Sequence, residues 1–421
     1  MRTTRRHVCG IAKNSQLSLE RLARRLAQRI GDSQKIPFFR IASQEQSAHG
    51  LPVTMAKREK SLKVVIACGG TGGHLFPGIA VAEELRARGH QPLLLISQKS
   101  VDREASRKYG DLEFIAIPAI AKPATTSPKM LPFLWKLWGA TRQCKAILRE
   151  RGADAVIGMG GFTSLAPVYA GKKLGLKTFV HDSNALPGKA NRLTARWCHQ
   201  VFVGMKEATA YFSGRSVVVT GTPVRKEMLV LPERATAAQR FGLDPARPIL
   251  VVMGGSQGAR RLNALVAEAF DHFPVGTQVL HVAGSTDEAR VREAANGRAG
   301  YVVLGFCDDM AAVYAVADLA LCRSGASSLT ELAHAALPSI LIPFPYAADD
   351  HQTKNAEVFA SARAATLVQE AVLDGPKLAQ LVSEIIDHPE RKRAMQEAAR
   401  ALDVPDAASR VCAAIEASAG K

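Results

Sequence analysis

Short apolar runs alternate with longer segments of helical pattern from Leu62 onward, and this alternation constrains the fold more than any other feature of the sequence. Such a pattern is typical of βαβ units, in which helices connect the parallel strands of one sheet. The apolar runs are Leu-rich or β-branched, and most of them end near Gly, Ser or Asp. We expect strands at 62–68, 92–97, 113–117, 154–158, 177–181 and 200–203, and then at 248–253, 277–282, 300–304, 318–321 and 339–342.

The two series of expected strands indicate two domains. A chain of 421 residues is longer than one hydrophobic core usually supports. The turn at 220–223 separates the series, so we place an N-terminal domain at 61–222 and a C-terminal domain at 223–402. Each series contains an apolar strand that runs into a Gly-rich turn and then a helix, at 64–74 and at 249–260. The sequence therefore predicts an α/β fold of two doubly wound, Rossmann-like domains that face a central cleft.

Positive charge is concentrated before the first expected strand. The formal net charge is +17, and residues 1–60 hold 13 Lys or Arg against 4 Asp or Glu. We expect 1–60 to be a basic leader that is disordered or not part of the native fold, with Met55 as a plausible later start. The weak helical pattern at 17–30 leaves a second interpretation open, a basic amphipathic helix on a membrane. Because the charge lies in the leader and no nucleic-acid module is recognised, we expect no nucleic-acid partner.

Composition limits the compartment and the contact with membranes. No apolar run reaches eighteen residues without a charge, so we expect no transmembrane helix and only peripheral membrane contact. The seven cysteines are scattered, without a CxxC pair or metal-ligand spacing, which is typical of reduced thiols in the cytoplasm.

A Gly-rich turn follows the first expected strand. Gly69–Gly73 would let the backbone approach an anion, and amides at a helix start favour phosphate. The helix is expected at 77–88, with Pro77 in its first turn. The turn is not GxGxxG, and no acidic residue follows at the spacing of dinucleotide-binding folds, which disfavours a dinucleotide ligand. His74 would lie at the positive helix end, which keeps it neutral and available as a base, unless it only caps the loop.

Two further motifs of the first half follow expected strands. GMGGFTS at 158–164 offers another backbone approach to the same cleft, or a structural tight turn. HDSN at 181–184 places polar side chains at the carboxyl edge of a strand, where functional groups collect. His181 and Asp182 are therefore either contacts to the acceptor or sugar, or a packed structural pair.

The second half repeats this chemistry. In GGSQGA at 254–259, Ser256 could donate to a phosphate oxygen. CRSGASSLTE at 322–331 joins a strand to a helix whose first amides could hold a diphosphate. Glu331 could accept from the ribose hydroxyls or could serve as a carboxylate near the helix start. DDHQTKN at 349–355 lacks a matching metal-ligand cluster, so we interpret it as a surface that contacts sugar hydroxyls.

In this order and at these separations, the motifs closely resemble the MurG-type N-acetylglucosaminyltransferases of glycosyltransferase family 28, from about Leu62 to about Ala414. The resemblance implies a GT-B fold and inverting transfer of N-acetylglucosamine from UDP-N-acetylglucosamine to the 4-hydroxyl of the muramyl unit of lipid I. The products would be lipid II and UDP, in peptidoglycan synthesis. The resemblance also implies no metal or other cofactor, a C-terminal helix at 403–421 that returns to the N-terminal domain, and a peripheral location on the cytoplasmic side of the inner membrane. Other cell-wall synthesis proteins are expected as further partners.

The resemblance assigns donor contacts to both halves. Glu331 would bind the ribose, Ser256 and the amides of 326–330 the diphosphate, and Gln352 the sugar. The full set of implied substrate contacts is Thr71, Gly72, Gly73, Asn184, Arg225, Ser256, Cys307 through its backbone, Ala326, Ser327, Ser328, Leu329, Thr330, Glu331 and Gln352.

The chain departs from the family pattern in two places. HDSN stands where the family often has HEQN, which shortens the carboxylate of Asp182 and weakens the case for an acid–base role there. The base is His74, His181 or neither. The leader at 1–60 has no counterpart in the family pattern.

Residues 130–138 mix aromatic and apolar side chains with cations, as at a membrane interface. We expect Phe133, Trp135 and Trp138 to seat the protein on the anionic lipids of the cytoplasmic membrane face. The alternative is a helix face that packs on the sheet.

Two other enzyme classes share the donor chemistry. Another GT-B UDP-sugar transferase with a different lipid acceptor would keep the donor motifs and differ at 71–74, 159–164 and 181–188. A nucleotide-sugar epimerase would need acid–base groups on both faces of the sugar, and the sequence offers no such set.

Overall fold

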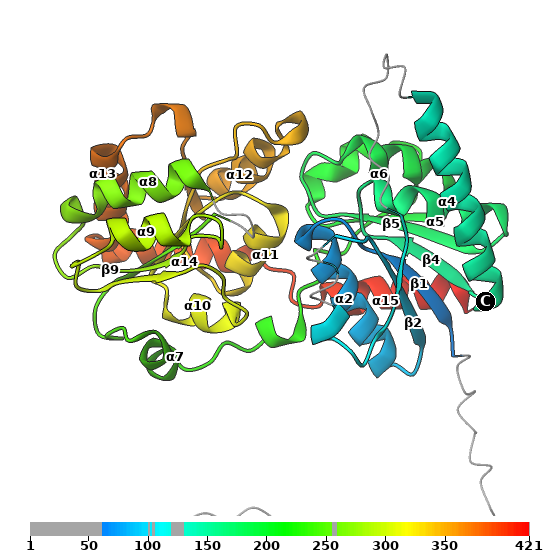
Figure 1. Ribbon diagram of the computed structural model, residues 1–421, viewed down its shortest axis with the longest axis horizontal. Helices are drawn as coiled ribbons and strands as arrows, with labels where there is room; N and C mark the ends of the chain where they lie inside the picture. Colours follow the sequence, from blue (N-terminus) through cyan, green and yellow to red (C-terminus); the bar gives the residue numbers. More distant parts are fainter. Residues whose placement is uncertain (1–60, 100–101, 103–105, 119–129, 255–258, 421) are drawn as a thin grey trace, which may run out of the picture. The chain divides into compact units, whose positions relative to one another are not determined.

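The structure is a computed structural model that describes residues 61–99, 102, 106–118, 130–254 and 259–420. The leader at 1–60 and Ser256 lie outside the described residues. Within these ranges the chain forms two parallel sheets with helices on both faces of each, which confirms the predicted α/β class (Figure 1).

The first sheet has seven parallel strands in the order β3-β2-β1-β4-β5-β6-β7. The strands are β1 Lys63–Ala67, β2 Gln91–Ile96, β3 Glu113–Ala116, β4 Ala155–Gly158, β5 Lys177–Asp182, β6 Gln200–Val203 and β7 Val217–Val219. The helices of this half are α2 Gly72–Ala87, α4 Met130–Glu150, α5 Leu165–Lys173 and α6 Lys189–Thr194, with 3-10 turns η1 Phe162–Ser164, η2 Ala195–Trp197 and η3 Lys206–Phe212.

The second sheet has six parallel strands in the order β10-β9-β8-β11-β12-β13. They are β8 Ile249–Met253, β9 Gln278–Val282, β10 Tyr301–Leu304, β11 Leu319–Cys322, β12 Ser339–Leu341 and β13 Ala365–Leu367. The helices are α7 Arg234–Phe241, α8 Arg260–Ala269, α9 Glu288–Ala294, α10 Met310–Val316, α11 Ala326–His334, α12 His351–Ser361, α13 Gly375–Ile386 and α14 Pro389–Ala401, with 3-10 turns η4 Lys226–Met228, η5 Phe270–His272, η6 Ala348–Asp350 and η7 Glu370–Val372.

The alternation of side chains along β1 builds a core on each face of the first sheet. Val64 and Ile66 point to one face and pack with α2, whereas Val65 and Ala67 point to the other face and pack with α4 and α5. Because both faces are covered, the strand is apolar at nearly every position rather than at every second one. This is why its sequence is a continuous apolar run.

The C-terminal helix α15, Ala407–Ala419, belongs to the core of the first half. Val411, Cys412 and Ile415 are fully buried in the cluster that contains α2. Figure 1 shows α15 against α2 and the first sheet, although the segment that precedes it, α14, packs in the second half. The chain therefore passes between the halves twice, once before α7 and once after α14.

Three elements differ from the sequence prediction. The short strands β7 and β13, three residues each, were not expected. Helix α2 begins at Gly72 instead of residue 77, so the placement of Pro77 in its first turn is wrong. Pro77 is tolerated there although it cannot donate a bond back to the carbonyl of Gly73. That carbonyl instead accepts the Ser327 hydroxyl, at 3.4 Å.

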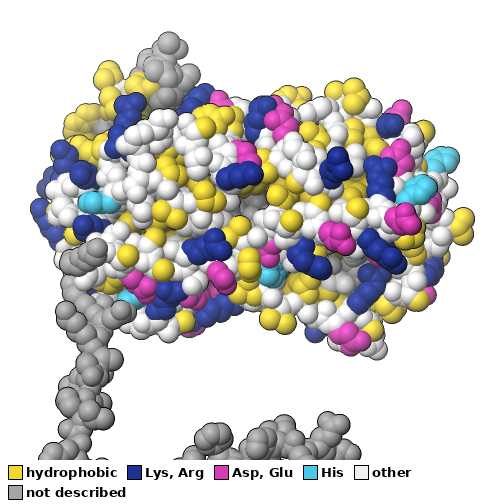
Figure 2. Space-filling view, turned by 180° about the vertical axis from the view of Figure 1, so that it is seen from behind, with side chains coloured by type: hydrophobic (Ala, Val, Ile, Leu, Met, Phe, Trp, Pro, Cys, Tyr) yellow, Lys and Arg dark blue, Asp and Glu magenta, His cyan; other side chains and the backbone are white. Residues whose placement is uncertain are grey.

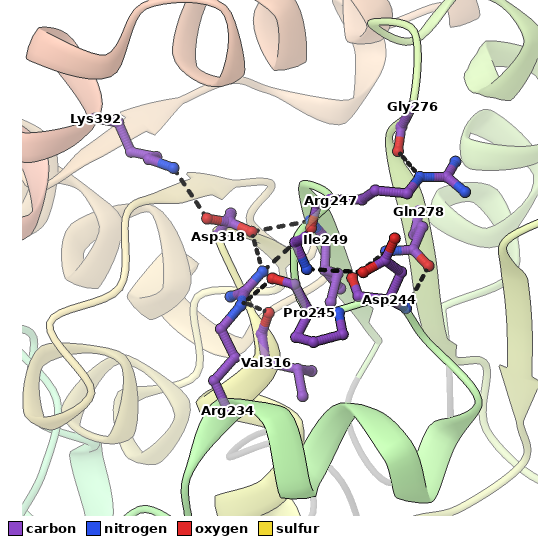
Figure 3. A network of polar contacts seen from close by, with 11 residues as sticks. Arg234, Asp244, Pro245, Arg247, Ile249, Gly276, Gln278, Val316, Asp318 and Lys392 are labelled. Carbon is purple, nitrogen blue, oxygen red and sulfur yellow. Dashed lines mark hydrogen bonds and ion pairs between the residues drawn. The ribbon is translucent and has the colours of Figure 1, made fainter.

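A polar network connects β8 and β11 of the second sheet at their amino ends, opposite the loops that follow the strands. Asp318, just before β11, accepts from the Ile249 amide at 3.0 Å, from Arg234 at 2.7 Å and from Lys392 at 2.9 Å (Figure 3). These donors come from β8, α7 and α14. Burial alone would raise the pKa of Asp318, but the Lys392 and amide hydrogen bonds hold it below its usual range.

Replacing Asp318 with Asn should lower the free energy of unfolding by about 2 kcal/mol, because two cations lose a charged partner that is mostly buried. Urea unfolding followed by circular dichroism measures the change. Asp308→Asn is the control, since Asp308 is 76% exposed and should change stability by less than about 0.5 kcal/mol. Equal effects of the two substitutions would contradict a stabilising role for the network.

Candidate active site

The glycine loops of the first half meet at the point where the strand order of the sheet reverses. β1 and β4 are neighbours, but their chain connections run outward to opposite sides of the sheet. Ligands of doubly wound sheets bind at such a switch point, beyond the carboxyl ends of the strands. GGTGGH follows β1 and GMGGFTS follows β4, and the Thr163 hydroxyl of the second loop donates to the Gly69 carbonyl of the first at 2.7 Å.

His74 lies in the first turn of α2, between these two loops. Its Nδ1 is 3.2 Å from the Thr71 hydroxyl. The ring packs against Gly160, where an added Cβ would lie 2.6 Å from the His74 Cδ2. Burial lowers the pKa of His74 to about 4. The imidazole is therefore neutral near pH 7 and can accept a proton.

The first glycine loop is held from beside β2 by a buried carboxylate. Asp102 Oδ2 accepts from the Gly70 amide at 2.9 Å and from the Ser97 amide at 2.8 Å. Lys99 Nζ donates to the Gly70 carbonyl at 2.8 Å. Sequence reasoning missed these residues, and the signal that could have found them is an acidic residue close after the neighbouring strand.

His181 and Asp182 are organising residues of the β5 end. The His181 side chain is fully buried, and its Nε2 donates to the Gly221 carbonyl at 2.9 Å. Burial lowers the pKa of His181 to about 4. Asp182 accepts from the Gly188 amide and from Asn191, at 3.0 and 2.7 Å. Both side chains are buried and hydrogen-bonded within the protein, so we retain His74 as the candidate base.

The second half presents its own switch point, between β8 and β11. The loop after β11 leads into α11, whose N-cap is Gly325, a residue without a side chain that could occupy the first amides. The first intrahelical bond found here runs from the Leu329 amide to the Gly325 carbonyl. The amides of Ala326, Ser327 and Ser328 precede it in the first helical turn, so they have no partner within the helix and can bind an anion.

The predicted residues of α11 differ in what their side chains contact. Leu329 is fully buried in the core, and Thr330 donates its hydroxyl to the Ala326 carbonyl at 3.0 Å. Glu331 accepts from the Tyr314 hydroxyl at 2.8 Å. Burial raises the pKa of Glu331, and the nearby Arg225 guanidinium opposes this rise.

A small pocket brings Arg225 and Glu331 together with α2. It is lined by Phe76, Pro77, Thr222, Pro223, Val224, Arg225, Ser327, Thr330 and Glu331. The Arg225 guanidinium stacks on the Phe76 ring, 4.2 Å from its centroid, and pairs with Glu227 at 3.2 Å. Stacking and ion pairing fix the plane of the guanidinium, so its place in the pocket is set before a ligand arrives.

The remaining predicted donor contacts lie on loops at the ends of strands. Gln352, near the start of α12, accepts from the Phe344 amide at 2.9 Å through its side-chain oxygen. Cys307 lies half-buried after β10, with its Sγ 3.5 Å from the Asp309 carbonyl. Thr71 and Gly73 are exposed and Gly72 is half-buried at the start of α2. Asn184 follows β5, and its amide nitrogen donates to Asp182 at 3.2 Å.

Helix α4 has a packed face and an exposed apolar face. Phe133 is only 7% exposed and makes an edge contact with Phe162, so the prediction that it contacts a membrane is wrong. Its periodic partners on the helix, Ala140 and Cys144, are buried as well. Trp135 and Trp138 are 75% and 58% exposed. Hydrophobic side chains gather beside Lys and Arg over the region where α4 begins (Figure 2).

Among the described residues, no helix is long and apolar enough to span a bilayer. The same ranges contain no group of three or more His, Cys, Asp or Glu side chains arranged to hold a metal ion.

In comparisons with known proteins, the two halves of the chain match the two domains of one enzyme family. Residues 64–203 match the glycosyltransferase family 28 N-terminal domain, and residues 249–411 match the glycosyltransferase family 28 C-terminal domain. The chain is 36% identical, over 362 residues, to the UDP-N-acetylglucosamine--N-acetylmuramyl-(pentapeptide) pyrophosphoryl-undecaprenol N-acetylglucosamine transferase of Citrifermentans bemidjiense. That alignment covers 84% of this chain and 99% of the relative.

Two further similarities agree with this result. The Myxococcus xanthus protein of the same name is 38% identical over 355 residues, which cover 82% of this chain and 90% of the relative. The crystal structure of Acinetobacter baumannii MurG superimposes with a TM-score of 0.69 at 26% identity, covering 85% of this chain and all of that protein. The chain therefore belongs to glycosyltransferase family 28, and within it to the UDP-N-acetylglucosamine--N-acetylmuramyl-(pentapeptide) pyrophosphoryl-undecaprenol N-acetylglucosamine transferases.

Proposed function

We propose that the chain transfers N-acetylglucosamine from UDP-N-acetylglucosamine to the 4-hydroxyl of the muramyl unit of lipid I, which yields lipid II and UDP for peptidoglycan synthesis. The observation that carries this proposal is the 36% identity to a transferase of that name over 99% of its length. The glycine and small-residue loops at the two switch points support it, because they offer backbone amides to a diphosphate.

The donor is bound mainly by the second half. The free amides at the start of α11 bind the diphosphate, and Glu331 accepts hydrogen bonds from the ribose hydroxyls. The Tyr314 hydroxyl donates to one oxygen of the Glu331 carboxylate. The remaining lone pairs of that carboxylate can accept from the ribose hydroxyls. Arg225 supports this site from the segment between the halves, and Gln352 contacts the N-acetylglucosamine from the start of α12.

Transfer proceeds by a single displacement that inverts the anomeric centre. As the bond to the diphosphate breaks, negative charge grows on the leaving oxygens, and the fixed amides at the start of α11 stabilise it. His74, neutral at physiological pH, accepts the proton of the attacking acceptor hydroxyl. The amide dipoles need no bound ion to act, so we propose that the reaction requires no metal or other cofactor.

The test is UDP release by purified protein with UDP-N-acetylglucosamine and a lipid I analogue, in the presence of EDTA. Release that requires the lipid and persists in EDTA supports the proposal. Loss of release in EDTA would contradict the metal-free reaction. Tight UDP binding without lipid-dependent release would point to a different acceptor.

We propose that the protein works peripherally at the cytoplasmic face of the inner membrane, where its acceptor lies. Leu131, Leu134, Trp135 and Trp138 form an exposed apolar surface on α4. The Arg142 guanidinium lies 5.8 Å from the Trp138 ring centroid. Exposed aromatic side chains next to cations suit the interface of an anionic bilayer.

Replacing Trp135 and Trp138 together with Ser should reduce binding to anionic phosphatidylglycerol vesicles at least about tenfold, because two large apolar groups no longer enter the interface. Sedimentation with vesicles measures this loss, and UDP affinity should remain unchanged. Val275→Ser is the control, because Val275 is fully exposed in the second half, away from α4. Vesicle binding that survives the double substitution would exclude this surface as the membrane contact.

A further inference from the structure

A fully buried side-chain amide joins the two halves beside the candidate site. Asn355, on α12, has no exposed surface. Its oxygen accepts from the Ala185 amide at 2.9 Å. Its nitrogen donates to the Asn184 side-chain oxygen at 3.0 Å and to the Ser324 carbonyl at 3.1 Å. Asn184 and Ala185 follow β5 in the first half, whereas Ser324 lies in the loop before α11 in the second half.

The partners of Asn355 fix the orientation of its amide. One partner is a backbone N–H, which requires an acceptor, and the other two are oxygens, which require donors. If the Asn355 amide were flipped, its nitrogen would face the Ala185 N–H. Its oxygen would then face the Asn184 side-chain oxygen and the Ser324 carbonyl. In a buried site each such mismatch leaves a polar group unsatisfied, at a cost of about 1–3 kcal/mol. The side chain is therefore held in one geometry.

The bond from Asn355 also determines what Asn184 can do. The Asn184 side-chain oxygen is occupied by Asn355, and its amide nitrogen donates to the Asp182 carboxylate at 3.2 Å. The Asn184 backbone amide donates to the same carboxylate at 2.9 Å. Asp182 is itself buried at the end of β5. Asn184 thus stands between a fixed carboxylate in one half and Asn355 in the other.

The chain of hydrogen bonds continues into the donor site. Ser324, whose carbonyl accepts from Asn355, donates its own hydroxyl to the Gln352 carbonyl at 2.8 Å. The loop that contains Ser324 leads directly into the free amides of α11. A displacement of Asn355 would therefore shift Asn184 relative to both the diphosphate amides and Gln352.

We propose that Asn355 is a positioning residue for glycosyl transfer: its buried amide couples the 183–188 segment to the 323–325 loop and sets Asn184 against the nucleotide-sugar. This inference rests on the proposed function, because Asn355 acts on the nucleotide-sugar site through Asn184. We expect Asn355 not to bind the nucleotide itself, because its hydrogen bonds run to Ala185, Asn184 and Ser324 and not to the α11 amides or Glu331. It aligns the sugar with the acceptor, where a misplacement of about 1 Å can reduce turnover about 100-fold.

A second contact between the two halves, from α6 to η6, supplies a control. Lys189 Nζ lies 2.5 Å from Asp349 Oδ1, but the Lys189 side chain is 72% exposed. An exposed ion pair contributes little because water screens it. Lys189 also has no bond to Asn184 among the hydrogen bonds found in the described residues. Lys189→Ala should therefore leave turnover unchanged if the effect belongs to the buried amide rather than to any contact between the two halves.

The experiment compares Asn355→Asp, Asn355→Ala, Asn184→Ala, the double variant N184A/N355A and Lys189→Ala. The variant N355D keeps the size of the side chain and the acceptor for the Ala185 amide, but sets a carboxylate against two oxygens. We expect N355D and N355A to lower kcat 10-fold to 100-fold with the Kd for UDP within about twofold of wild type. We expect N184A/N355A to be no slower than N184A alone, because the two residues act as one unit.

Hydrogen exchange provides a measurement that does not depend on turnover. The Ala185 amide should exchange at least tenfold faster in N355A, while the Leu329 amide of α11 should be unaffected. Losses of kcat that multiply in the double variant, wild-type turnover in N355D, or an unchanged Ala185 exchange rate would each overturn the inference. If the wild-type protein did not transfer N-acetylglucosamine, the proposed function would be excluded. The Ala185 exchange rate would still show whether Asn355 couples the 183–188 segment to the 323–325 loop.

Discussion

Replacing His74 with Gln should lower kcat by about 100-fold or more, because a general base commonly contributes a factor of about 10²–10⁴ to the rate. Glutamine can still hydrogen-bond the Thr71 hydroxyl but cannot accept a proton near neutral pH. The affinity for UDP should be nearly unchanged, since the nucleotide is bound by α11 in the second half. Initial rates at saturating donor and lipid acceptor, together with UDP titration by calorimetry, separate the two effects.

His388→Gln is the matched control, because His388 is exposed at the start of α14. It should retain the wild-type kcat. A His74→Gln variant with more than about a tenth of the wild-type kcat would exclude His74 as the base, since the loss would fall below the range for general-base catalysis.

The pH dependence of kcat/KM follows from the environment of His74. Burial lowers its pKa to about 4, so the base is unprotonated at neutral pH and stays so as the pH falls toward that value. Activity limited by His74 should therefore be lost only as the pH is lowered through about 4. A loss of kcat/KM centred near pH 6.5 would show a histidine in ordinary contact with water, and would contradict this assignment.

Replacing Gly78 with Val should unfold the protein or lower its free energy of unfolding by about 3 kcal/mol or more. Gly78 lies inside α2, and an added Cβ there would be 2.3 Å from the Cys68 Cβ and 2.8 Å from its Sγ. Gly78 and Cys68 are both buried where α2 packs against the end of β1. The side chain could fit only if α2 moved away from the sheet, and α2 carries His74.

Gly139→Val is the matched control for this prediction. Gly139 also lies inside a helix, α4, but an added Cβ would have no atom within 4 Å. Its substitution should change stability by less than about 0.5 kcal/mol, since valine is no worse than glycine in a helix. Urea unfolding of the two variants gives the comparison. A Gly78→Val protein as stable as Gly139→Val would contradict the close packing of α2 on β1.

The strands at the centre of each sheet could be predicted because helices cover both of their faces. β1, β4, β8 and β11 are buried along nearly their whole length, and this leaves continuous apolar runs in the sequence. β7 and β13 lie at sheet edges and have three residues each, too few for a pattern. The start of α2 was predicted at residue 77 because proline is common in the first turn of a helix. Pro77 leaves the Gly73 carbonyl without its helical donor, and the Ser327 hydroxyl that replaces this donor comes from the other half, so no local pattern shows it.

The glycine loops of the site could be predicted for a similar reason. A backbone that approaches an anion needs glycines after a strand, and this is a local pattern. The contacts that shape the site are different, because they join residues far apart in the sequence. Asn355 meets Asn184, and Asp102 meets the Gly70 amide, without any shared motif. Their side chains are ordinary polar residues until the fold brings them together.

Burial explains why two of the predicted side chains, Phe133 and His181, are inaccessible. Phe133 and Trp135 lie two residues apart on α4, so they point in different directions, and only the first faces the packed side of the helix. His181 lies near the carboxyl end of β5, where functional side chains collect, but it is fully buried and its Nε2 donates to the Gly221 carbonyl. The sequence pattern locates such residues on an element without showing which face they occupy.

The most direct test of the account is the identity of the product formed from UDP-N-acetylglucosamine and lipid I. Mass spectrometry of the purified lipid, followed by NMR of the new linkage, should show one added N-acetylhexosamine on the muramyl 4-hydroxyl in the β configuration. A lipid of unchanged mass with free N-acetylglucosamine in solution, or a product in the α configuration, would contradict inverting transfer to lipid I.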